Sequence, residues 1–331
     1  MKYYIGIDIG GTNISTGVVD ETYNIVGRGK VKTGSGRPYE EVVKDIIESV
    51  KLAADDAGVD MDDVRWIGAG CPGTCNCETG IIEYSNNLQW ENAPLLADIE
   101  NAFGKKTYIE NDANAAAYGE FLAGAAKGAK NAVVITLGTG VGAGIIINGK
   151  IFSGTNYAGG EIGHTVIVID GYQCTCGRKG CFETYASATG LARMTKEALE
   201  AHPESKISSL VEADGRISAR TAFNAAKMMD DVGQAVVDRY IKALACGITN
   251  TINIFQPDIL CIGGGVCNEG DRLLVPLKKL VAESIYSKNS KKNTEICICS
   301  LGNDAGVIGA AMLGKSAESG ILKSVFGGKE K

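Results

Sequence analysis

Apolar and polar residues alternate at the start of the chain in the manner of a β-strand. Residues 3–8 are rich in isoleucine, the pattern breaks at Gly10-Gly11, and it resumes over residues 15–19. Two strands joined by a glycine-bearing turn predict a β-hairpin. The same order of features returns about 130 residues later: a strand over 132–136, the turn Gly138-Thr139-Gly140, and a strand over 144–147. We therefore predict an internal duplication in which a hairpin opens each of two α/β domains.

The remainder of the chain mixes helical and strand-like periodicities. Residues 40–57 carry apolar side chains at helical spacing, which predicts an amphipathic helix. Further helices are predicted over 113–126, 186–199, 218–230, 232–251 and 305–314, and further strands over 64–70, 108–109, 259–262 and 296–300. The expected boundary follows Asp112: a small domain of residues 1–112, rejoined by a C-terminal helix at about 303–331, and a large domain of residues 113–302.

Length and charge narrow the class of protein. A chain of 331 residues is too long for one ordinary domain. The formal net charge is −6 and no basic stripe is present, so we expect no nucleic-acid partner. No run of 18 apolar residues is found, so no membrane span is expected. The first residues lead straight into a strand without the pattern of a signal peptide, and we expect a cytoplasmic protein.

The first turn has the residues that a phosphate group requires. In Asp8-Ile9-Gly10-Gly11-Thr12-Asn13, the glycines allow the backbone N–H groups to approach a phosphate closely. The Thr12 hydroxyl can donate to a phosphate oxygen, and Asp8 can hold the water shell of Mg²⁺. The second turn, Gly138-Thr139-Gly140, can contact the same phosphates. Hairpins that bind nothing are the alternative for both.

Neither turn is a Walker loop, because no Gly-Lys-Ser/Thr follows, and neither is a Rossmann motif, because a strand comes next. Together the two turns resemble those of the superfamily that contains actin and hexokinase. This resemblance implies two duplicated actin-like, or ribonuclease-H-like, ATPase domains with ATP bound in an interdomain cleft. Gly263-Gly264-Gly265-Val266 resembles the adenosine motif of that superfamily, which implies nucleotide contacts for Gly264, Gly265 and Val266.

The run from Glu110 to Glu120 (ENDANAAAYGE) carries the candidate base. A hydroxyl that attacks a γ-phosphoryl group needs a carboxylate within reach to accept its proton. Asp112 stands where a strand gives way to a helix, which is a rigid position for such a base. The alternative is that Asn111 and Asp112 cap the alanine-rich helix, since both residue types are favoured at helix N-termini.

This run resembles the ROK family of bacterial sugar kinases and repressors, as do Gly159-Gly160-Glu161-Ile162-Gly163-His164 and the run from Cys174 to Glu183 (CTCGRKGCFE). The resemblance covers essentially the whole chain. It implies that Asp112 is the catalytic base for a sugar hydroxyl, usually O6. It also implies sugar contacts for Asn111, Glu161, His164 and Glu183, and for Asn87 on a looser match.

Three cysteines and one histidine form a candidate zinc site. Cys174, Cys176 and Cys181 stand within eight residues, and His164 lies ten positions upstream. Three thiolates and one imidazole make a closed tetrahedral site, which is structural rather than catalytic. We expect zinc to fix the loop that presents Glu161 and Glu183, with one His164 nitrogen on the metal and the other facing the sugar. Three reduced cysteines on a loop are the alternative.

The sequence departs from the family pattern after Pro72-Gly73, where a Pro-Val-Asp-like run is replaced by Thr74-Cys75-Asn76-Cys77. Cys71, Cys75 and Cys77 have a spacing that could hold a second metal, but no fourth ligand is close in the sequence. Loop thiols are therefore favoured, and their redox sensitivity stays open.

Three functions compete. The first is an ATP:hexose 6-phosphotransferase, with glucose as the leading substrate because the run after Cys174 resembles the glucokinase branch. Fructose, N-acetylglucosamine and N-acetylmannosamine are the alternative substrates, and some relatives use polyphosphate as the donor. The second is a sugar-responsive repressor, disfavoured because no helix-turn-helix precedes the first strand. The third is a nucleotide-driven chaperone or filament protein. Family resemblance implies a homodimer or tetramer.

Overall fold

A computed structural model describes residues 2–318, with only the backbone of Glu318 at its end. The chain divides into two compact units. Within the described residues, unit 1 comprises residues 2–134, 144–160 and 299–318, and unit 2 comprises Ile135–Ala143 and Glu161–Ile298. Each unit is described by itself below. Within the described residues, no helix is both long enough and apolar enough to cross a membrane.

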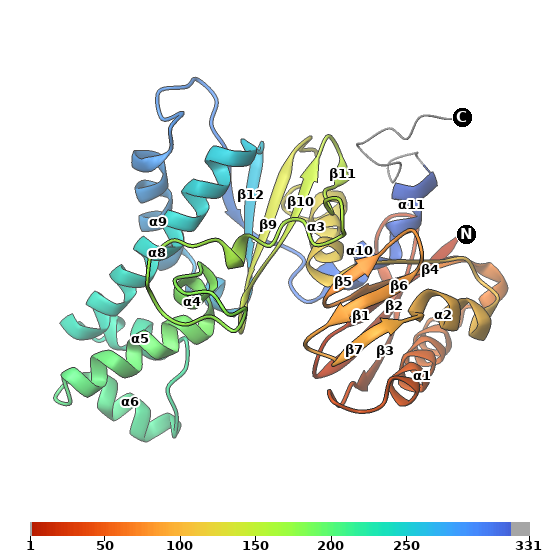
Figure 1. Ribbon diagram of the computed structural model, residues 1–331, viewed down its shortest axis with the longest axis horizontal. Helices are drawn as coiled ribbons and strands as arrows, with labels where there is room; N and C mark the ends of the chain where they lie inside the picture. The colour runs from red at the N-terminus through yellow and green to blue at the C-terminus, as the bar shows by residue number, and fades with distance from the viewer. Residues whose placement is uncertain (1, 319–331) are drawn as a thin grey trace. The chain divides into compact units, whose positions relative to one another are not determined.

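A five-stranded sheet forms the centre of unit 1, with strand order β3-β2-β1-β4-β8 (Figure 1). Its strands are β1 (Tyr3–Ile9), β2 (Asn13–Val19), β3 (Ile25–Lys32), β4 (Val64–Cys71) and β8 (Thr107–Asn111). The predicted first hairpin is confirmed, since β1 and β2 pair antiparallel. Strand β4 pairs parallel with both β1 and β8. The carboxyl ends of β1, β4 and β8 therefore meet at one edge of the sheet.

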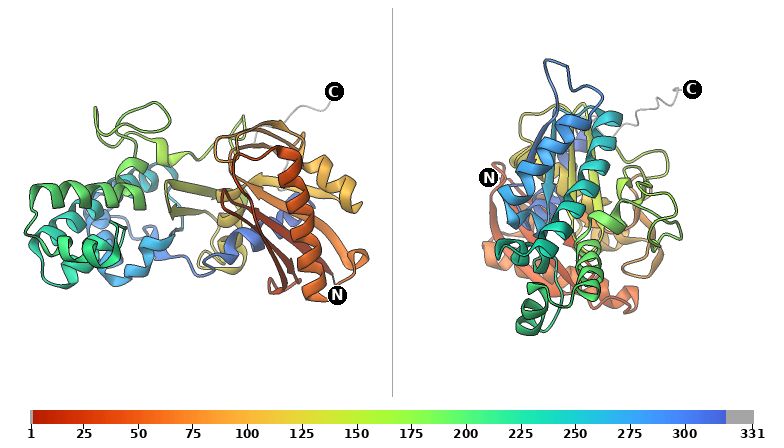
Figure 2. Two further views of the ribbon diagram at one scale, coloured as in Figure 1. Left: turned by 90° about the horizontal axis from the view of Figure 1, so that it is seen from below. Right: turned by 90° about the vertical axis from the view of Figure 1, so that its left-hand side faces the viewer.

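Helices cover this sheet at very close range. Helix α1 (Tyr39–Ala57) runs along β2 and β3 (Figure 2), and its C-cap is Gly58. Helix α10 (Asp304–Ala311) packs directly on β1 and β4, because Gly6 and Gly68 leave room for its backbone. A Cβ on Gly6 would lie 1.9 Å from the Val307 carbonyl oxygen, and one on Gly68 would lie 1.8 Å from that of Ala310. Small residues thus bring the helix backbone onto the sheet.

Helix α3 (Asp112–Ala123) belongs to unit 1, whereas the predicted boundary falls after Asp112. The physical reason is its contact with α10. A Cβ on Gly309 would lie 1.7 Å from the Ala115 carbonyl oxygen, and one on Gly119 would lie 2.2 Å from that of Ala305. The two helices pack backbone to backbone, so the compact unit extends past residue 112. Residues 303–318 lie in unit 1 as well, and the rest of the predicted C-terminal helix lies outside the described residues.

A second sheet has the order β11-β10-β9-β12-β13, and a small antiparallel sheet in unit 1 has the order β5-β6-β7. The second sheet contains β9 (Ala132–Leu137), β10 (Val141–Ile147), β11 (Lys150–Ile151), β12 (Ile259–Gly263) and β13 (Glu295–Ile298). The small sheet contains β5 (Thr74–Asn76), β6 (Ile81–Ser85) and β7 (Trp90–Ala93). Strands β9 and β10 flank the turn Gly138–Gly140, as predicted for the second hairpin. The chain passes from unit 1 to unit 2 within β9 and returns within β10.

Unit 2 is rich in helices, and the long α8 (Asp231–Phe255) lies at its centre. The Asp230 side chain caps α8 by accepting from the Gly233 N–H at 2.7 Å. The buried Phe182 ring packs against Gly247 of α8, where a Cβ would meet the ring at 2.3 Å. The other helices of unit 2 are α4 (Glu183–Ala186), α5 (Ala188–Ala201), α6 (Lys206–Asp214), α7 (Thr221–Lys227) and α9 (Asp271–Ser284). The predicted helix over 186–199 corresponds to α5 and to the last residue of α4, and Ser187 separates the two helices.

The remaining elements of the described chain are short: α2 (Leu95–Phe103) and α11 (Leu313–Glu318) in unit 1, and the 3-10 turns η1 (Met61–Asp63), η2 (Ile162–His164) and η3 (Gly265–Glu269).

Candidate functional site

Asp8 and Asp112 lie close together at the edge of the unit 1 sheet. Asp8 pairs in register with Gly70 of β4, and a Cβ on Gly70 would lie 3.4 Å from the Asp112 Cα. Burial and, to a smaller extent, the negative charge of Asp112 together raise the pKa of the Asp8 carboxyl to about 6. Gly306 of α10 leaves the space for this carboxylate, since a Cβ there would lie 2.8 Å from Asp8 Oδ2. Two carboxylates at one edge form a plausible centre for a cation and a proton transfer.

The turn after Asp8 is held by a residue that the pattern did not predict. The Thr33 hydroxyl donates to the Gly10 carbonyl oxygen at 2.6 Å, and the Thr33 N–H donates to the Thr12 carbonyl oxygen at 3.0 Å. The Gly10 N–H donates to the Asn13 carbonyl oxygen at 3.0 Å. Thr12 remains exposed, and a Cβ on Gly11 would have no atom within 4 Å. The turn is therefore fixed at its base and open at its tip, which suits a phosphate-binding role.

Asn111 is the N-cap of α3, and Asp112 is the first residue of the helix. The Asn111 Oδ1 accepts from the N–H groups of Ala113 and Asn114 at 2.9 and 3.2 Å, while its Nδ2 donates to the Gly73 carbonyl oxygen at 3.1 Å. Capping, the alternative interpretation of this pair, is therefore the role of Asn111 in the structure. The Ala113 N–H also donates to the Asp112 Oδ1 at 2.9 Å, so both residues of the pair contact the first turn of the helix.

Glu110 lies fully buried next to this pair, and no role was predicted for it from the sequence. Its carboxylate accepts from the Asn111 N–H at 2.9 Å and from the Asn114 side chain at 3.0 Å. It also accepts from the Cys77 thiol at 3.4 Å and from the Ser153 hydroxyl at 3.3 Å. The only signal in the sequence was its position beside Asn111, because two of its partners, Cys77 and Ser153, lie 33 and 43 positions away.

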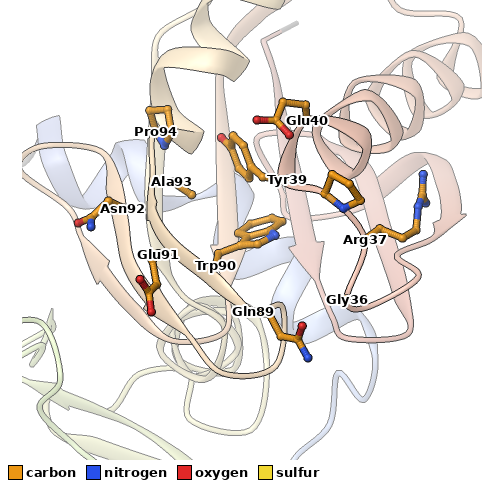
Figure 3. Close-up of a pocket in the computed structure, with 11 residues that line it drawn as sticks. Gly36, Arg37, Tyr39, Glu40, Gln89, Trp90, Glu91, Asn92, Ala93 and Pro94 are labelled. Carbon is orange, nitrogen blue, oxygen red and sulfur yellow. The ribbon is translucent and has the colours of Figure 1, made fainter.

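Asn87 is exposed, and its segment borders a cavity of about 590 Å³. The Ser35 hydroxyl donates to the Asn87 carbonyl oxygen, which ties two loops together. In the cavity, the rings of Tyr39 and Trp90 meet edge to face at 5.0 Å, and Gln89 stands at the rim (Figure 3). Asn87 itself does not line this cavity. The sugar contact of Asn87 therefore stays a prediction that rests on the loose sequence match.

Glu183 contacts the second turn. Its Oε2 accepts from the Val141 N–H at 3.1 Å, and a Cβ on Gly140 would lie 2.1 Å from the same oxygen. The turn is closed by a bond of 3.0 Å from the Gly138 N–H to the Gly140 carbonyl oxygen, while Thr139 is exposed. A residue predicted to hold a sugar therefore also positions a turn predicted to hold phosphate, a link that the sequence did not indicate.

The four candidate zinc ligands converge in unit 2. One ligand atom from each of His164, Cys174, Cys176 and Cys181 lies within 4.8 Å of all the others. The Cys174 Sγ is 3.6 Å from the His164 Nδ1, and the Cys176 Sγ is 3.6 Å from the Cys181 Sγ. The fold thus brings into one cluster four residues that span 17 positions of the chain. The Glu183 Oε1 lies 4.0 Å from the His164 Nδ1, so the cluster adjoins a predicted sugar ligand.

Two further predicted segments are placed as follows. Glu161 is exposed and directly precedes the 3-10 turn η2 that carries His164. Gly264 has a φ of 97°, and a Cβ there would lie 2.2 Å from the Leu137 carbonyl oxygen, so the chain requires glycine at this point. Gly265 is open, with no atom within 4 Å of a Cβ, and Val266 is buried at the start of η3.

The structure groups the candidates by unit. Asp8, the first turn, Asn87, Asn111 and Asp112 lie in unit 1, and Asp8 adjoins Asp112 there. The second turn, Glu161, His164, Glu183, the cysteines and the glycine segment lie in unit 2. Within unit 2, Glu183 adjoins both the second turn and the His–Cys cluster.

Comparison with known proteins gives a consistent result. The family model described as "ROK family" matches residues 4–317. A glucokinase from Halalkalibacterium halodurans is 38% identical over 97% of this chain and 98% of that protein. A glucokinase from Thermotoga maritima is 35% identical over 96% of this chain and 98% of that protein. The crystal structure of a ROK family glucokinase from Streptomyces griseus, in complex with glucose and AMPPNP, has a TM-score of 0.80 and 35% identity, covering 94% and 98% of the two chains.

Proposed function

Because the chain belongs to the ROK family, we propose that it phosphorylates a hexose at O6 with ATP, converting glucose to glucose 6-phosphate. The observation that carries the proposal is the carboxylate pair of Asp8, near the end of β1, and Asp112, at the strand-to-helix turn that opens α3. The similarity over nearly the full chain to glucokinases supports glucose as the sugar. The similarity to a glucokinase structure with glucose and AMPPNP supports ATP as the donor.

In the proposed reaction, the sugar O6 attacks the γ-phosphorus of ATP, and the bond between that phosphorus and the β,γ-bridging oxygen breaks. Asp112 accepts the O6 proton, and the electron pair of the broken bond leaves with ADP. A transition state of this kind needs charge stabilisation and alignment more than covalent help. The backbone of the first turn, fixed by Thr33, and the exposed Thr12 hydroxyl supply donors for the phosphates.

Asp8 is the residue suited to hold Mg²⁺, because it offers a carboxylate at the edge where the phosphates would lie. Magnesium supplies positive charge to the β- and γ-phosphates and usually keeps several of its waters, so one carboxylate suffices. A bound cation would also draw the Asp8 proton off, which offsets the effect of burial on its pKa.

Zinc is proposed for the cluster of His164, Cys174, Cys176 and Cys181. A tetrahedral site with bonds of about 2.3 Å to sulfur and about 2.0 Å to nitrogen has edges of about 3.5–3.8 Å. The two separations of 3.6 Å in the cluster fit these edges. Four protein ligands close the coordination shell, so the metal would hold the loop and leave the chemistry to Asp112. With Nδ1 turned toward Cys174, the Nε2 of His164 is the nitrogen left for a sugar hydroxyl.

Sugar recognition is assigned, on the resemblance to the family, to Asn87, Asn111, Glu161, His164 and Glu183. The Asn111 amide has one hydrogen left after capping, and Glu183 keeps lone pairs beyond its bond to Val141. Adenosine contacts are assigned to Gly264, Gly265 and Val266, where glycines leave room. The predicted domain boundary after Asp112 and the predicted homo-oligomer stay predictions, the latter open to light scattering.

A single assay tests the function. ADP release is followed with glucose, fructose, mannose, N-acetylglucosamine and N-acetylmannosamine, with ATP or polyphosphate as the donor. The proposal expects kcat/KM for glucose with ATP to exceed that for every other pair by about tenfold or more, because a misplaced or extra group at a hydrogen-bonded site costs at least this factor. No sugar-dependent ADP release would favour the repressor alternative, and a better N-acetylhexosamine would change the substrate.

A further inference from the structure

The Glu110 side chain is a buried carboxylate that has no lysine or arginine among its hydrogen-bond partners in the described part of the chain. It is 1% exposed, and its hydrogen-bond partners are an amide N–H, an asparagine, a thiol and a hydroxyl. Burial raises the pKa of Glu110, while these donors oppose the rise. A carboxylate that serves only as packing would be replaced at lower cost by an apolar side chain. A buried carboxylate that accepts from four donors is instead suited to fix the geometry of the segments that carry those donors.

One oxygen of Glu110 fixes the turn that carries the proposed base. Its Oε1 accepts from the Asn111 N–H and from the Asn114 side chain, one residue and four residues ahead. Asn111 in turn caps α3 and reaches the Gly73 carbonyl oxygen. The first turn of α3, which carries Asp112, is thus held by hydrogen bonds at both of its ends. A shift of about 1 Å in a reacting group can cost about 100-fold in rate.

The other oxygen of Glu110 reaches a second loop. Its Oε2 accepts from the Ser153 hydroxyl, and Ser153 stands at the base of the loop of residues 153–160. The Gly159 N–H donates to the Ser153 carbonyl oxygen at 2.8 Å, and a Cβ on Gly159 would lie 2.8 Å from the Gly154 nitrogen. The loop is therefore closed on itself, and its last residues directly precede Glu161. The Cys77 thiol, just after β5, is the other donor to this oxygen.

We propose that Glu110 is a positioning residue. Through its contact with Ser153, Glu110 fixes the position of the Asn111–Asp112 turn relative to the loop that leads into Glu161. Glu110 touches neither sugar nor nucleotide in this account. The inference rests on the proposed sugar kinase activity for its kinetic consequence. Its structural part, that the two segments are coupled through one carboxylate, stands apart from that activity.

Three variants test the coupling. In Glu110→Gln, the amide oxygen can keep both Oε1 contacts, while its NH₂ group can donate to Ser153 and Cys77, whose groups also accept. This variant should keep kcat/KM for glucose within about fivefold. Glu110→Ala loses the link and should reduce kcat/KM by about 100-fold. Ser153→Ala removes only the loop contact and should raise the glucose KM by about three- to tenfold, with kcat and the ATP KM within about twofold.

Glu120→Gln is the matched control. Glu120 is another buried carboxylate, at the other end of α3, where it accepts from the N–H groups of Ala125 and Leu301 at 2.8 Å. Its loss should lower the melting temperature without changing either KM, since it lies outside the proposed coupling. If Glu120→Gln and Ser153→Ala gave the same kinetic pattern, the role of Glu110 would be general stability, and the proposal would fail.

Hydrogen exchange measured by mass spectrometry separates this inference from the activity. Ser153→Ala should speed amide exchange in the segments 107–116 and 153–161 together, and Glu120→Gln should leave both unchanged. Exchange that rises in 153–161 alone, with no change in the glucose KM, would overturn the coupling. Wild-type protein that releases no ADP with any sugar would contradict the proposed function, while the exchange result would still decide the coupling.

Discussion

The two glycine turns share a backbone pattern but differ in their chemistry. The first follows β1 and reads Asp8-Ile9-Gly10-Gly11-Thr12, and the second follows β9 and reads Thr136-Leu137-Gly138-Thr139-Gly140. Where the first has a half-buried carboxylate next to Asp112, the second has a threonine. The second turn instead has a carboxylate from elsewhere, Glu183, against Gly140. The two copies of the hairpin thus differ in the source of their carboxylate: Asp8 belongs to the first hairpin itself, and Glu183 reaches the second from another segment.

The neighbours of each turn explain the difference. Gly306 makes room for the Asp8 carboxylate, while Gly140 makes room for Glu183. Glu183 then connects the second turn to Cys174 and His164. A defect in the first turn should therefore appear in kcat, and a defect in the second should appear in sugar affinity. The predictions that follow test this division, from the largest expected effect to the smallest.

Asp8→Asn should lower kcat by about 100- to 1000-fold, because a neutral amide is a poor ligand for Mg²⁺. Less positive charge would then stabilise the phosphate oxygens in the transition state. Thr136→Val alters the aligned position of the second hairpin with nearly the same shape, and it should leave kcat within about threefold. Steady-state kinetics at saturating glucose and ATP compare the two. Equal losses of kcat in both variants would mean that the two hairpins have the same role in the reaction.

Gly140→Ala should raise the glucose KM by about tenfold or more, since the new Cβ would lie 2.1 Å from the Glu183 Oε2 and must displace it. A double-mutant cycle supplies the control. In a Glu183→Ala background no carboxylate is left to displace, so adding Gly140→Ala should change the glucose KM by less than about twofold. Additive effects would show that Gly140 acts independently of Glu183.

Cys176→Ser should reduce the zinc content well below one per chain and lower the melting temperature by roughly 5–10 °C, because a structural site contributes directly to folding energy. Cys246→Ser, at an exposed cysteine of α8, is the control for losing a thiol. Elemental analysis and thermal unfolding measure both variants. The glucose KM should rise in Cys176→Ser alone, through Glu183. A metal-free wild-type protein of unchanged stability would contradict the zinc assignment.

Asp8→Asn should also stabilise the protein without ligands above pH 6, by up to about 3 kcal/mol. The folded pKa of about 6 exceeds the ordinary value of 3.8, so the folded state favours the protonated carboxyl. Its contribution to stability is complete below about pH 4 and is lost as the pH rises through about 6. The difference between variant and wild type in urea unfolding should thus shrink from pH 7.5 to pH 4. A constant difference would refute the pKa shift, and Thr136→Val should show none.

The sequence pattern predicted those helices and strands whose formation depends on residues close together in the chain. The isoleucine-rich strand of residues 3–8, the helix of residues 40–57 and the buried strand over 259–262 all form, because their side-chain periodicity suffices to bury one face. The His–Cys cluster was found as well, since the ligand types themselves carry the signal. Strands β5 to β7 were missed because their short, polar segments gain stability only from pairing with one another.

Contacts between distant positions were beyond the reach of the sequence. Ser153 meets Glu110 across 43 positions, and Glu183 meets Val141 across 42. The contact between α3 and α10 is of the same kind, because it depends on Gly119 and Gly309, which are nearly 200 positions apart. No periodicity in one chain reports such pairs.

The central claim, that Asp112 is the base beside the first turn, is tested most directly with Asp112→Asn. Glucose binding is measured by calorimetry and turnover by ADP release, on the same preparation. The account predicts a glucose Kd within about threefold of wild type and a kcat lower by about 1000-fold, since the amide can hold a hydroxyl but cannot take its proton. Turnover within about tenfold of wild type, with binding intact, would remove Asp112 from that role.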